Sequence, residues 1–230
     1  MPNRARMLLE IIEAMRTAVG PDFPIAVKLN SADFQKGGFA FEDSLQVAQW
    51  LEEAGVDLIE ISGGTYEQPR LVGLDGIEAV EEQPVARSTL MREAYFVDFA
   101  VAMREKVSIP LMVTGGFRKR AAMEQAIESG STDLIGIGRP MCIDTDAPSQ
   151  LLAGLDELSR YEQGLSLLPK WLSPLTRIPL VRSIAGFSTM YWFYAQLYSL
   201  AREGVPQTDI SVFEGARQVL KMEKRLLKAR

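Results

Sequence analysis

The chain has 230 residues, of which 47% are apolar and 24% are charged, and its formal net charge is −5. This length suffices for one good-sized domain with its own core. The composition is ordinary for a soluble globular protein. The negative charge argues against a general surface for nucleic acid or for anionic membranes. We therefore predict that the protein binds neither nucleic acid nor a membrane.

Cysteine and histidine content narrows the chemistry. Cys142 is the only cysteine, so no disulfide forms within the chain, and a reducing, cytoplasmic location is predicted. The chain has no histidine, which excludes histidine catalysis and histidine metal ligands; no metal site is predicted. The first ten residues lack the apolar core of a signal peptide. The most apolar late segment, 187–200, is too short to span a bilayer.

The first 140 residues alternate between helical and strand patterns. Helices are predicted over 4–19, 41–54, 91–106 and 118–129, and strands over 24–30, 56–62, 109–114 and 133–137. A polar loop over 65–89 follows the second strand, either as a solvated excursion or as a lid. Four strand–helix repeats are typical of parallel βαβ architecture. The sequence therefore predicts an α/β domain over 1–150.

The pattern changes after residue 150, where no strand is predicted. Helices are predicted over 149–162, 183–203 and 211–228, so that 151–230 forms a helical extension packing on the first domain. An aromatic run, 190–194, lies inside the second of these helices. Its pattern favours helix packing or a subunit contact over a cage for a ligand.

The predicted strands are apolar at one parity only. The other parity carries small and polar residues, which are Ala26, Lys28, Asn30, Leu58, Glu60, Ser62, Gly136 and Gly138. A parallel sheet that is covered on both faces would be almost continuously apolar. Because successive side chains point to opposite faces, one face packs on helices and the other is polar. In a barrel the polar face is the interior, where active sites are built at the carboxyl ends of strands.

Two glycine turns follow the third and fourth strands. Gly115 and Gly116 end the first, and Gly138 and Arg139 end the second. Glycine lets the backbone approach an anion closely, and a following helix adds the positive end of its dipole. Either turn alone is equally explained by a need for positive φ. Two such turns on adjacent strands favour a phosphate site, to which Arg139 contributes its guanidinium or only its N–H.

Two further side chains have alternative interpretations. Lys28 lies within the first strand on the polar face, either as a cation facing a bound cofactor or in an ion pair with Glu60 of the next strand. Cys142 has no base nearby in the sequence. It is interpreted as a small buried residue, with a reactive thiol as the alternative.

Several motifs together resemble the old yellow enzyme family of FMN-dependent oxidoreductases. They lie at 3–10, 27–34 (VKLNSADF), 60–66 (EISGGTY), 92–96, 113–117 (VTGGF) and 133–140 (DLIGIGRP). The resemblance implies FMN at the mouth of a TIM barrel, with its phosphate on the backbone of Gly115, Gly116, Gly138 and Arg139. Lys28 stands where the family usually has an arginine near the flavin, which keeps the charge but loses the bidentate fork.

In the resembled family these motifs belong to strands five to eight. The resemblance thus implies a parallel (βα)4 half of a TIM barrel plus C-terminal helices, without the strands that carry the substrate-binding histidines and a tyrosine proton donor. No catalytic residue is predicted. The expected function is an FMN-binding oxidoreductase of the ene-reductase or NAD(P)H:flavin oxidoreductase type, with NAD(P)H as hydride donor and a small-molecule substrate.

Two alternatives remain open from the sequence. One is a non-catalytic FMN- or phosphate-binding half, completed by another chain or by dimerisation, because two unpaired strand edges favour a homo-oligomer or a complementing N-terminal half. The other is an unrelated phosphate-binding barrel, such as an aldolase or an isomerase.

Overall fold

The structure is a computed structural model that describes residues 2–33, 37–63 and 96–228. Within these ranges the chain divides into two compact units, the first ending at Ile137 and the second beginning at Gly138. The predicted loop over 65–89 and the start of the predicted helix over 91–106 lie outside the described residues. In the part of the chain that the structure describes, no helix is both long and apolar enough to cross a membrane.

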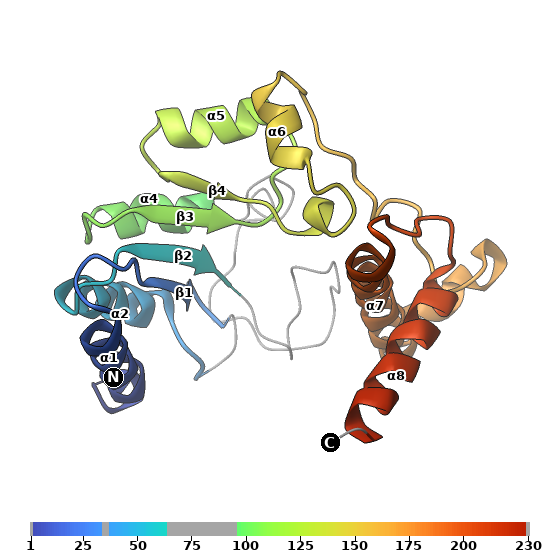
Figure 1. The fold of residues 1–230 in the computed structure, drawn as a ribbon, viewed down its shortest axis with the longest axis horizontal. Helices are drawn as coiled ribbons and strands as arrows, with labels where there is room; N and C mark the ends of the chain where they lie inside the picture. Colours follow the sequence, from blue (N-terminus) through green and yellow to red (C-terminus); the bar gives the residue numbers. More distant parts are fainter. Residues whose placement is uncertain (1, 34–36, 64–95, 229–230) are drawn as a thin grey trace. The chain divides into compact units, whose positions relative to one another are not determined.

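The first unit holds a four-stranded parallel sheet in the order β1-β2-β3-β4. Figure 1 shows the four strands side by side with their arrowheads in the same direction. The sheet and its helices confirm the predicted α/β class. The elements are α1 (Pro2–Val19), β1 (Ala26–Asn30), α2 (Phe41–Glu53), β2 (Leu58–Ser62), α4 (Val97–Arg104), β3 (Leu111–Thr114), α5 (Arg120–Glu128) and β4 (Leu134–Gly136).

The two faces of the sheet differ as the strand pattern predicts. On the covered face, the buried side chains are Ile25 just before β1, Leu29, Ile59, Ile61, Leu111 and Val113. On the opposite face, Lys28 lies in register with Glu60, and Met112 with Leu134. The covered face supplies the apolar burial that holds the unit together, which leaves the other face open for polar groups.

The entry to β1 is fixed by hydrogen bonds from backbone groups to one arginine and one aspartate, both partly exposed. Asp57 accepts a hydrogen bond from the N–H of Ile25 at 2.7 Å and another from Arg16 at 2.6 Å. Arg16 also donates to the carbonyls of Gly20 and Phe23, at 3.1 and 2.6 Å. These bonds satisfy carbonyl groups that the end of α1 and its following turn would otherwise leave unpaired.

The entry to β3 repeats this arrangement. Asp133 accepts a hydrogen bond from the N–H of Leu111 at 2.8 Å and forms an ion pair with Arg104. Arg104 also donates to the carbonyl of Ile109 at 3.0 Å. We call the two arrangements, Arg16 with Asp57 and Arg104 with Asp133, the entry clamps. Both hold the amino ends of strands, at the edge of the sheet opposite its carboxyl ends.

The first entry clamp makes the free energy of unfolding depend on pH in the acidic range. The N–H of Ile25, and then Arg16, hold the pKa of Asp57 below its usual 3.8. A lowered pKa in the folded state contributes stability above the pKa of the unfolded state, and this contribution is lost as the pH falls through the folded value. Because the carboxyl is partly exposed, we expect Asp57→Asn to lower the free energy of unfolding at pH 7 by at most about 1 kcal/mol.

The measurement is urea denaturation between pH 7 and pH 3. The variant should show a shallower loss of stability below about pH 4 than the wild type. Asp22→Asn, which removes an exposed carboxyl from the turn after α1, is the control. Parallel profiles for Asp57→Asn and the wild type would contradict the role given to the clamp.

The second unit is helical, and no strand follows Gly136 among its described elements. One predicted helix is wrong in extent. A helix was expected over 149–162, whereas α6 ends at Leu152 because the chain turns at Gly154 with a φ of 105°. The elements are η2 (Arg139–Cys142), α6 (Ala147–Leu152), η3 (Lys170–Arg177), α7 (Pro179–Glu203) and α8 (Val212–Lys228).

The core of the second unit forms around the aromatic run of α7. Trp192 and Phe193 are buried with Val212, and their rings meet edge to face at a centroid distance of 5.2 Å. The indole N–H of Trp192 donates to the carbonyl of Ile210 at 2.9 Å. A Cβ on Gly215 of α8 would lie 3.0 Å from Trp192 Cα, so glycine permits the two helices to approach closely. For Trp192 and Phe193, the helix-packing interpretation is confirmed.

Candidate functional site

The open face of the sheet carries an ion pair between its edge strand β1 and the neighbouring strand β2. Lys28 of β1 donates to the carboxylate of Glu60 of β2, and the two residues are opposite one another in the register. The Lys28 side chain is 54% exposed and that of Glu60 is 23% exposed. The ion-pair interpretation of Lys28 is therefore confirmed. Since the Lys28 side chain is still half exposed, its cation also remains accessible to a ligand above this face.

Polar atoms without a protein partner gather at the carboxyl ends of the strands. The Oδ1 of Asn30, the hydroxyl of Ser31 and the hydroxyl of Thr114 are buried and have no hydrogen-bond partner among the described residues. The amide of Asn30 donates instead to Asp33 at 2.6 Å. Buried polar atoms are rarely left unpaired in folded proteins. These three atoms can therefore bind polar groups of a ligand at this end of the sheet.

The turn after β3 has the backbone that the sequence predicts. Gly115 and Gly116 have φ values of 140° and 82°, a region that residues with a Cβ rarely adopt. Glycine is therefore required here by conformation, and the turn continues into α5, which begins at Arg120. Because a phosphate would be bound by N–H groups in the same turn, the conformation fits that role as well. Phosphate binding by Gly115 and Gly116 stays a prediction.

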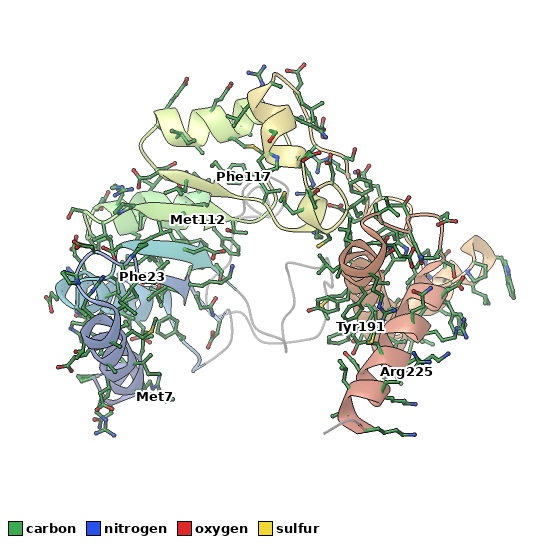
Figure 2. The ribbon with its side chains drawn as sticks, in the orientation of Figure 1. Met7, Phe23, Met112, Phe117, Tyr191 and Arg225 are labelled. Atoms are coloured by element: carbon green, nitrogen blue, oxygen red, sulfur yellow. The ribbon has the colours of Figure 1, made fainter. Side chains whose placement is uncertain are left out.

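Gly136 of β4 lies very close to Thr114 of β3, which the sequence alone does not reveal. A Cβ at this position would lie 1.8 Å from the hydroxyl of Thr114 and 2.8 Å from Cε of Met112; Figure 2 labels Met112 on β3. A side chain at 136 would thus occupy the surface beside the Thr114 hydroxyl. Sequence reasoning missed Thr114 and Ser31 as site residues, although a polar residue at the end of each strand was a usable signal.

The second predicted turn belongs to the second unit. Gly138 precedes η2, and the Arg139 guanidinium lies 3.4 Å from the carboxylate of Glu162. Because the guanidinium is paired with Glu162, the backbone N–H of Arg139 is the more available donor of a hydrogen bond to a phosphate. That Gly138 and Arg139 share one phosphate with Gly115 and Gly116 stays a prediction from the sequence.

Cys142 packs beside the core of the second unit. Its thiol is half-buried, and Sγ lies 3.9 Å from the carbonyl of Gly138. Burial raises the pKa of the Cys142 thiol, and the nearby Arg139 lowers it by less. A raised pKa reduces the thiolate that a reactive cysteine needs. The structure therefore favours the packing interpretation over the reactive one.

The sequence model of the NADH:flavin oxidoreductase / NADH oxidase family matches residues 1–157. The chain belongs to this family. The family's cofactors are FMN and NAD(P)H, and the predicted resemblance to old yellow enzyme-type oxidoreductases is confirmed. The glycine turn, the half-exposed cation and the unpartnered hydroxyls of the first unit fit a cofactor with a phosphate and a polar ring.

Family members with curated names include NADH-dependent flavin oxidoreductases of two fungi. The protein iliE of Neonectria sp. (strain DH2) is 38% identical over 64% of this chain and 19% of its own length. The protein iccE of Talaromyces variabilis is 37% identical over 65% of this chain and 35% of its own length. The NADH oxidase of Thermoanaerobacter brockii is 31% identical over 66% and 21%. The chain thus spans about a fifth to a third of these relatives.

A solved structure supports the fold. A 2-naphthoyl-CoA reductase in complex with 2-naphthoyl-CoA matches 66% of this chain and 21% of its own, with a TM-score of 0.55 and 27% identity.

Proposed function

We propose that the first unit is the FMN-binding half of a TIM barrel, corresponding to strands five to eight, in an oxidoreductase of the ene-reductase or NAD(P)H:flavin oxidoreductase type. The observation that carries this proposal is the open polar face of a four-stranded parallel sheet, in a chain of this family. That face has the Lys28–Glu60 pair on β1 and β2 and the Gly115–Gly116 turn at the carboxyl end of β3.

The proposed roles follow from the chemistry of each group. The N–H groups of Gly115, Gly116, Gly138 and Arg139 would hold the phosphate, as glycine turns before helices do in other proteins. Lys28 would present positive charge toward the ring of the cofactor. Bound FMN supplies hydride transfer between a nicotinamide and an acceptor, and the protein binds and orients it.

The half-barrel needs other strands at its edges. Among the described strands, β1 pairs only with β2 and β4 only with β3. Edges of this kind leave backbone groups unpaired and invite pairing with another chain. We infer that a complementing N-terminal half or a second copy of this chain completes the barrel, in the cytoplasm, around a small-molecule substrate.

A second candidate function is a non-catalytic half that binds FMN or phosphate. The ion pair between Lys28 and Glu60 favours it, because a paired lysine gives less charge to a cofactor than a free one. The two candidates differ in turnover but share the FMN site. Flavin reduction by NADH or NADPH in the purified chain, alone or with its complementing half, separates them.

The deciding experiment is a visible absorbance spectrum of the purified full chain, recorded before and after addition of FMN. We expect flavin absorbance that stays with the protein through gel filtration. A colourless chain that also fails to retain added FMN, while its circular dichroism shows a folded α/β protein, would overturn the proposal.

Lys28→Met tests the role of the cation. The variant is expected to bind FMN roughly fivefold more weakly, which corresponds to loss of one partly exposed charge contact. Flavin reduction by NADH should slow in parallel. Lys28→Arg, which keeps the charge, is the matched control and should retain affinity near that of the wild type. Unchanged affinity and reduction kinetics in Lys28→Met would remove Lys28 from the site.

A further inference from the structure

The second unit contains a groove between α7 and α8 with a volume of about 630 Å³. Ile184 of α7 and Phe213 and Leu220 of α8 contribute apolar walls. The groove is also lined by five cationic residues of α8, which are Arg217, Lys221, Lys224, Arg225 and Lys228; Figure 2 labels Arg225 on this helix. Among the described residues that line the groove, none is acidic. Apolar walls next to cationic side chains are complementary to a ligand that has both an apolar part and a negative charge.

Three large apolar residues of α8 recur along one side of the helix. Phe213, Leu220 and Leu227 are spaced seven residues apart, which places them close to one line along a helix. Their exposures are 66%, 45% and 71%. A row of large exposed apolar side chains is unusual on a helix that already buries Val212 and Val219 on its inner side. The row is therefore a second apolar surface, distinct from the contact that packs α8 on its unit.

The cations form a parallel row beside it. Arg217, Lys221, Lys224 and Lys228 follow one another at intervals of four, three and four residues, which keeps them on one face. Arg217 has a partner, Glu214, at 3.9 Å. Within the part of the chain that the structure describes, no carboxylate pairs with Lys221, Lys224 or Lys228. Because these cations are uncompensated, an anion beside the apolar row would be favoured.

The dimensions of the groove select the class of ligand. Its volume lies within the range of roughly 300–1,000 Å³ that is typical of sites for small molecules. The part of the apolar row that lines the groove, from Phe213 to Leu220, is about 10 Å long at 1.5 Å per residue, which suits one alkyl chain. A flat bilayer surface would not fill a concavity.

We propose that the groove between α7 and α8 binds a single-chain anionic amphiphile, namely an alkyl carboxylate of the length of decanoate. The alkyl chain lies on Ile184, Phe213 and Leu220, and the carboxylate lies among Lys221 and Lys224. The site shares no residue with the FMN site and stands independently of it.

The test is calorimetric titration of the purified full chain with decanoate, decanol and acetate, below the micellar concentration. Decanoate should bind at least tenfold more tightly than decanol, because only the former has charge for the lysines. Acetate should show no measurable binding. The double variant Lys221→Glu/Lys224→Glu should bind decanoate roughly tenfold more weakly or worse. Lys106→Glu, at an exposed position in the first unit, is the matched charge control and should bind as the wild type does.

Ile184→Asp tests the apolar wall separately and should weaken both decanoate and decanol. Equal affinity for decanoate and decanol would overturn the proposal, as would decanoate binding that the double variant leaves unchanged. Sedimentation of the chain with phosphatidylglycerol vesicles, without binding of free decanoate, would replace the proposed ligand by a membrane surface. The circular dichroism spectrum of each variant establishes that its helices are intact.

Discussion

Trp192→Ala is expected to lower the free energy of unfolding by about 3–5 kcal/mol, the usual cost of removing a large buried aromatic side chain. Trp192 is 2% exposed, lies edge to face with Phe193, and donates its indole N–H to Ile210. The variant removes the ring from the core between α7 and α8 and leaves the Ile210 carbonyl without this donor. A loss of this size is a large fraction of the roughly 5–15 kcal/mol that stabilises a typical domain.

The measurement is urea denaturation followed by circular dichroism. Trp171→Ala is the matched control, because Trp171 is 77% exposed and the same substitution there should change stability by at most about 0.5 kcal/mol. Similar midpoints for the two variants would show that Trp192 does not hold this core together. Trp192→Phe should fall between the wild type and Trp192→Ala, since it keeps most of the ring but loses the hydrogen bond.

Gly136→Ala is the second substitution expected to have a large effect. The added Cβ would lie 1.8 Å from the hydroxyl of Thr114, a distance at which one of the two strands must move. Overpacking of this kind costs about 1–3 kcal/mol. Because the shift occurs at the carboxyl ends of β3 and β4, the FMN affinity proposed for this chain should fall together with stability.

The companion variant is Gly136→Ala/Thr114→Ala. Removing the hydroxyl relieves the shortest contact, while the Thr114 Cβ would still lie 2.7 Å away, so stability should recover only in part. Gly138→Ala is the control for stability, because an added Cβ there meets nothing within 4 Å. If Gly136→Ala melts at the wild-type temperature, the strands are further apart than the structure places them.

The faces of the sheet could be predicted because they depend on local alternation. Side chains two residues apart share a face whatever the rest of the chain does, so the apolar parity of β1, β2 and β3 indicated the covered side. The pairing of Lys28 with Glu60 followed once consecutive strands were taken as neighbours. These inferences needed only the position of each strand, the alternation of side chains along it, and the order of the strands in the sheet.

The features that sequence reasoning missed depend on distances between strands. The contact of Gly136 with Thr114 requires the register of β3 against β4. The hydroxyls of Ser31 and Thr114 are distinctive only because they are buried without partners, which no local pattern reveals. The early end of α6 at Leu152 is the exception, because Gly154 is visible in the sequence and a glycine there ends the helix that the spacing over 149–162 predicts.

The two entry clamps also bear on how the sheet assembles. Arg16 and Asp57 are 41 residues apart, and Arg104 and Asp133 are 29 apart, so each clamp closes around one strand and the helix that follows it, up to the start of the next strand. Contacts between residues close in sequence cost less entropy to form than distant ones and favour faster folding. The sheet thus consists of two strand pairs, β1–β2 and β3–β4, each held by its own entry clamp. We expect the β2–β3 pairing that joins them to form last during folding.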